Sequence, residues 1–74
     1  MNVYTVKVEH CNAEHEVEAP HGIECISKFY EQYPQYFKDD VTYIILNRAA
    51  SGIKVRYTVS GRGSKYKIEL IGML

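Results

Sequence analysis

The chain has 74 residues, of which 46% are hydrophobic, and its nine basic and nine acidic side chains leave no net charge. A chain of this length and hydrophobic content forms one small folded domain, residues 1–74, and is not intrinsically disordered. Nearly every apolar side chain is needed to close such a small core. We therefore expect no catalytic cleft, no enzyme activity and no bound cofactor.

The first part of the chain predicts two strands joined by a turn. Residues 3–9 and residues 14–19 alternate between apolar and polar side chains. Alternation with a period of two is the pattern of a half-buried strand. The residues between them include Asn12, which tolerates left-handed backbone geometry, so we expect a turn there.

Residues 23–33 predict the one helix of the chain. Five apolar side chains recur there at the spacing of a single helical face: Ile23, Ile26, Phe29, Tyr30 and Tyr33. Gly22 is the residue available as an N-cap. Pro34 disfavours helical geometry at the residue before it, so we expect the helix to end at residue 33.

The C-terminal half predicts three further strands, at residues 41–46, 53–60 and 65–70. We prefer a four-residue loop before the last strand, because it places Arg56 opposite Glu69, whereas a two-residue loop would place it opposite a lysine. The preferred register pairs Val59 with Tyr66, Tyr57 with Ile68 and Val55 with Leu70.

This order of elements predicts an α+β fold of two layers, in which a five-stranded, mostly antiparallel sheet carries the helix on one face. The other face is expected to be open to water or to a partner. In the third strand, either Tyr43 and Ile45 or the pair that alternates with them must lie on that open face. An exposed apolar pair there has three explanations: a binding partner, a homodimer, or cover from Tyr36 and Phe37.

Charge is distributed unevenly along the chain. Residues 1–47 carry eight acids and three bases, whereas residues 48–74 carry six bases and one acid. Alternation places four bases of the last two strands on the open face, and a fifth lies in the turn between those strands. We expect these five side chains to form a compact basic patch that binds a partner: Lys54, Arg56, Arg62, Lys65 and Lys67.

An alternative interpretation gives the same bases a structural role. The second strand carries three glutamates on one face, Glu14, Glu16 and Glu18. If that strand lies close to the last two, these carboxylates neutralise the basic patch across the sheet.

All three histidines and both cysteines lie between His10 and Cys25, without the paired spacing of a structural zinc site. His10, Cys11 and His15 flank the first turn, whereas His21 and Cys25 follow the second strand, about 20 Å away. We therefore expect no metal site and no disulfide between the two cysteines. Cys25 is expected to be a small packed side chain near the helix start rather than a nucleophile.

No stretch has the basic and apolar regions of a signal peptide, and the longest aliphatic run, residues 44–46, is far too short to span a membrane. Together with two unpaired cysteines, this pattern predicts a protein of the reducing cytoplasm that does not associate with membranes.

Three segments in succession carry a resemblance: V-Y-T-V-K-V at residues 3–8, H-E-V-E-A at residues 15–19 and G-I-E-C-I at residues 22–26. Followed by strands, they resemble short phage and mobile-element proteins, including some anti-CRISPR proteins with a bent antiparallel sheet and one helix. The resemblance implies a non-catalytic protein that blocks a host protein or nucleoprotein complex by occupying a surface, and it assigns no functional residues.

The alternative function is a nucleic-acid-binding module. In that case the basic hairpin formed by the last two strands would contact phosphate groups.

Overall fold

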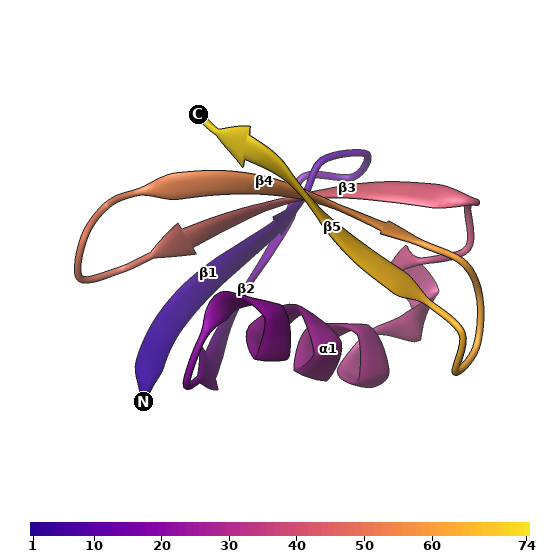
Figure 1. Cartoon of the computed structure of the whole chain (residues 1–74), viewed down its shortest axis with the longest axis horizontal. Coiled ribbons are helices and arrows are strands. Elements are labelled where there is room, and N and C mark those ends of the chain that lie inside the picture. The colour runs from indigo at the N-terminus through magenta and orange to yellow at the C-terminus, as the bar shows by residue number, and fades with distance from the viewer.

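The computed structural model describes all 74 residues and has the predicted α+β fold, with one five-stranded antiparallel sheet and one α-helix (Figure 1). In chain order the elements are β1 (Asn2–Val8), β2 (Ala13–Ala19), α1 (Gly22–Gln32), the short 3-10 helix η1 (Pro34–Tyr36), β3 (Val41–Arg48), β4 (Lys54–Ser60) and β5 (Lys67–Met73). The strand order in the sheet is β2-β1-β3-β4-β5, so β2 and β5 are the two edges. None of the helices has the length and apolar character required to cross a membrane.

The core lies between α1 and one face of the sheet. Strand alternation sends Tyr4, Val6 and Val8 of β1 and the apolar side chains of β4 to this face, as predicted, because a strand turns successive side chains to opposite sides. In β3, whose facing the sequence left open, Ile44 and Leu46 lie on this face. From the helix, Cys25, Ile26 and Phe29 are fully buried against them. The buried apolar side chains of the sheet are Tyr4, Val6, Val8, Val17, Ala19, Ile44, Leu46 and Val59.

The helix runs within one residue of its predicted ends, but Gly22 is its first residue rather than its cap. The N-cap is His21, which makes no side-chain capping bond. A side chain at Gly22 has little room, because a Cβ atom there would lie 3.0 Å from Leu46 Cδ2 and 3.1 Å from the hydroxyl of Tyr57. Glycine thus lets the first turn of α1 approach the sheet closely.

The predicted register of the last hairpin is wrong by two residues. The structure pairs Val59 with Ile68, Tyr57 with Leu70, Thr58 with Glu69 and Arg56 with Gly72. The connection is longer than expected because Tyr66 leaves the strand to stack on Tyr30 of α1, with ring centroids 4.1 Å apart. The Tyr30 hydroxyl also donates a hydrogen bond to the carbonyl of Gly63 (3.2 Å), which holds the turn towards the helix.

The third strand turns Tyr43 and Ile45 away from the helix, because Ile44 and Leu46 are buried in the core. The predicted explanation that Tyr36 and Phe37 cover the outward pair Tyr43 and Ile45 is wrong. Phe37 is buried on the helix side, where both rings pack against Phe29 at centroid distances of 5.8 Å.

Candidate functional site

The sheet face opposite α1, here called the open face, has no second layer over it (Figure 1). The strand pairings bring Tyr43, Ile45 and Arg56 to its middle, on β3 and β4. Around this centre lie polar and charged side chains from every strand: Thr5 and Lys7 from β1, Glu14, Glu16 and Glu18 from β2, Asn47 from β3, Lys54 and Thr58 from β4, and Lys67 and Glu69 from β5. Glu9, the residue after β1, also lies there, because its backbone N–H donates a hydrogen bond to the carbonyl of Tyr43 (3.1 Å).

Arg56 is held in place by two neighbours. Its guanidinium donates two hydrogen bonds to the Glu9 carboxylate, from Nε at 2.7 Å and from Nη2 at 3.2 Å. The same group lies over the ring of Tyr43, 4.7 Å from the centroid. The hydrogen bond with Glu9 raises the pKa of Arg56 further above its usual range, so the side chain stays charged. Glu9 thus pre-orients the cation–π pair of Arg56 and Tyr43 at the centre of an uncovered surface.

The five bases predicted to bind a partner do not form one compact patch. Lys54, Arg56 and Lys67 do project from the open face, but at one end, at the centre and at the other end of the last two strands. Lys67 pairs with Ser60, six residues along β4 from Lys54, which corresponds to about 20 Å.

The other two predicted bases lie off the open face. Arg62 and Lys65 belong to the turn before β5, which folds towards the helix side of the sheet. Arg62 is paired with Asp40, at 3.3 Å between Nη2 and Oδ1. Within the five, therefore, only Arg56 belongs to the ordered centre of the open face.

The glutamates of β2 do not neutralise the bases of the last hairpin. Two strands, β1 and β3, separate β2 from β4, and β5 lies at the opposite edge of the sheet. Arg56 is neutralised by Glu9 instead, and Lys67 lies 3.9 Å from Glu69 on its own strand. The open face is therefore mixed in sign, with an acidic column along β2.

Sequence reasoning missed Glu9 as a site residue and left the facing of Tyr43 open. Glu9 lies 47 residues before Arg56, and only the strand order β1-β3-β4 brings them together. The alternation in β1 and β4 did place both side chains on the face away from the helix. Knowledge of the strand order was the missing signal.

The histidines and cysteines separate into different surroundings. His10 Nε2 lies 3.0 Å from the Tyr36 carbonyl oxygen and His15 Nε2 lies 2.8 Å from the Tyr36 hydroxyl, so both hold η1 against the first hairpin. Cys11 is exposed, whereas Cys25 is buried, and burial raises the pKa of the Cys25 thiol to about 11. A thiol with this pKa is protonated at neutral pH and is not an activated nucleophile.

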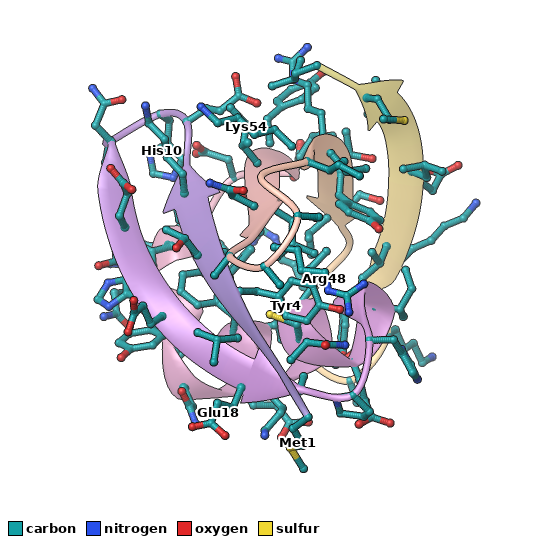
Figure 2. All side chains as sticks on the ribbon, turned by 90° about the vertical axis from the view of Figure 1, so that its left-hand side faces the viewer. Met1, Tyr4, His10, Glu18, Arg48 and Lys54 are labelled. Atoms are coloured by element: carbon teal, nitrogen blue, oxygen red, sulfur yellow. The ribbon has the colours of Figure 1, made fainter.

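A cavity on the helix side opens at the end of the molecule that faces the viewer in Figure 2, where Tyr4 and Arg48 are labelled. It is lined mostly by apolar groups: Tyr4, Gly22, Leu46, Arg48, Ser51, Ile53, Val55 and Tyr57. Burial raises the pKa of Tyr57, and Tyr4 and Cys25 raise it further. Arg48 is engaged with Asn2, donating from Nη2 to Oδ1 at 2.9 Å.

Comparisons of the chain with protein-family models, with curated proteins and with solved structures find no match.

Proposed function

We propose that this chain is a small non-catalytic binding protein, an inhibitor of the anti-CRISPR kind, that blocks a host protein or nucleoprotein complex by occupying its surface. The observation that carries the proposal is the Arg56–Tyr43 pair at the centre of the open face. Tyrosine and arginine are, with tryptophan, the side chains enriched among residues that dominate the energetics of protein interfaces. Glu9 already restrains Arg56, so a partner that packs on it meets a side chain with little entropy left to lose.

The surroundings of this pair have the anatomy of a protein interface. Val41 and Tyr43 are exposed apolar side chains on β3, and charged side chains of both signs surround them. Further along β3, past Ile45, the open face has a hollow whose lining includes Lys7, Asn47 and Lys54. The Oδ1 atom of Asn47 is buried and has no hydrogen-bond partner within the chain. An apolar and aromatic centre within a polar rim favours a protein partner.

Nucleic acid is the second candidate for the partner, because the charges on the open face are mixed in sign. A phosphate-binding surface needs a continuous run of positive charge, and here Glu9 and Glu69 interrupt the bases of β4 and β5. The bases that favour it are Lys54 and Lys67 on the open face and Lys65 in the turn, all exposed.

The test is loss of partner binding on removal of the Tyr43 ring. Tyr43 is 42% exposed, so Tyr43→Ala leaves the core intact. The variant should bind a host partner, once one is captured from host cells with the unaltered chain, at least about tenfold more weakly. Ile23→Ala is the matched control, because Ile23 is 46% exposed but lies on α1, on the other side of the sheet. Equal affinity of the Tyr43→Ala variant and the unaltered chain would refute this site.

Two further measurements separate the candidate functions. In cells with an active CRISPR system, expression of the chain should restore plaque formation by a targeted phage, and Tyr43→Ala should abolish that effect. Fluorescence anisotropy with random single- and double-stranded DNA and RNA tests the alternative. Binding that falls steeply as salt is raised, and that survives Tyr43→Ala, would favour the nucleic-acid module.

A further inference from the structure

The two edges of the sheet differ in character. The edge strand β2 carries three exposed glutamates, a feature that discourages another strand from pairing there. The edge strand β5 and the residue after it carry four apolar side chains that are between 52% and 70% exposed: Leu70, Ile71, Met73 and Leu74. Pairing within the chain uses only the side of β5 that faces β4, so its outer backbone groups are free to pair with another strand.

We infer that the partner of this edge is a second copy of the same chain, which pairs antiparallel along β5 about a two-fold axis perpendicular to the sheet. This inference goes beyond the proposed function and uses a different surface. An exposed apolar edge strand is a ready template for another strand, and two identical edges pair through an isologous contact.

Symmetry and charge select the register. With the axis perpendicular to the sheet, the helices of both copies lie on the same side of the joined sheet. Each residue of β5 must then pair with a residue of the second copy whose side chain is on the same face. This condition places the axis beside one residue of β5, which lies opposite its own counterpart. An axis beside Lys67 or Glu69 would set like charges opposite each other. An axis beside Ile68 sets Lys67 opposite Glu69 of the second copy, twice, so the two strands are complementary in charge.

The irregularity in β5 supports the same register. The ladder with β4 shifts between Arg56 and Tyr57, so the regular part of β5 ends at Leu70. An axis beside Leu70 would draw in the residues beyond this bulge, which disrupts pairing. The axis beside Ile68 pairs Lys67 to Glu69 of the two copies and brings Leu70 opposite the segment that precedes β5 in the second copy, on the helix side. Leu70, which is 63% exposed, thereby lies at the contact, whereas Ile71, Met73 and Leu74 lie beyond the regular part of the strand.

Such a dimer joins the two sheets into one and brings both open faces to the same side. Two Arg56–Tyr43 pairs would then lie on one continuous surface, related by the two-fold axis. A surface of this kind fits a partner with two equivalent sites, or one extended site.

Sedimentation of charge variants tests the register directly. The unaltered chain should show a monomer–dimer equilibrium between micromolar and millimolar concentration. Lys67→Glu alone and Glu69→Lys alone should each weaken self-association about tenfold, since each replaces two attractive contacts by two repulsive ones. An equimolar mixture of the two single variants should form a heterodimer, and the double variant Lys67→Glu with Glu69→Lys should dimerise like the unaltered chain.

Glu16→Lys, on the other edge strand, is the control and should leave self-association unchanged. Thermal unfolding of each variant checks that the fold is retained. A chain that stays monomeric at millimolar concentration, or a dimer that is indifferent to both single reversals, would overturn the inference. Tyr43→Ala should still dimerise, so failure of the inhibitor function and failure of the dimer are separate results.

Discussion

Alkaline pH should destabilise the fold through Cys25. Its side chain is fully buried, and burial raises the pKa of the thiol from 9.0 to about 11. Above pH 9 the unfolded chain releases this proton and the folded chain keeps it, so the free energy of unfolding falls as pH rises. The contribution is fully present below about pH 9. Its loss should reach about 2 kcal/mol at pH 11, from a shift of about two units at 1.36 kcal/mol each.

The assay is urea unfolding of the unaltered chain and of Cys25→Ala at several pH values from 8 to 11. Alanine lowers stability at every pH because it leaves a small cavity, but it removes the thiol titration. The gap between the two curves should therefore narrow by about 2 kcal/mol as pH rises. The raised pKa of Tyr57 acts in the same direction, and most of it is common to both proteins because burial is its main cause. Cys25 adds to that shift, so the Cys25→Ala variant also loses a small part of the tyrosine contribution, which narrows the gap further.

Parallel curves for the two proteins would refute the reasoning about Cys25. A thiol reagent gives an independent measurement at pH 8. Exposed Cys11 should react at once, and Cys25 should react only when the chain unfolds.

Two further changes test how the connections are held. Tyr36→Phe removes the hydroxyl that lies 2.8 Å from His15 Nε2. It should lower the free energy of unfolding, measured by urea denaturation, by about 1 kcal/mol. An unchanged urea midpoint would show that this contact contributes nothing to stability. Gly61→Ala should cost about 1–3 kcal/mol, because φ is +89° and the new Cβ would lie 2.6 Å from the Lys65 carbonyl oxygen. Gly63→Ala is the control, with φ of +63° and no atom within 4 Å of the new Cβ, and should cost only about 1 kcal/mol; equal losses would contradict the steric argument.

The sheet shows what a local pattern can determine. Alternation in β1 and β4 assigned the core and open faces correctly, because the period of two is a property of each strand alone. The spacing of Ile26 and Phe29, with Pro34 beyond them, located α1 within one residue, because helical periodicity and the effect of a proline are also local properties of the chain. At Asn12 the expected left-handed turn is present, with φ of +56°.

The sequence by itself thus determined the elements, their order and, in α1, β1 and β4, which side chains turn inwards. Only the tertiary structure decided which strands are neighbours, and with them the register of β5 and the partner of Arg56. Tyr66 leaves its strand for the ring of Tyr30, and Glu9 reaches Arg56 across β3. Both contacts join residues far apart in the chain, and their free energy outweighs the local charge pairing from which the register was predicted. Periodicity describes one segment at a time, whereas these contacts exist only after the segments have packed together.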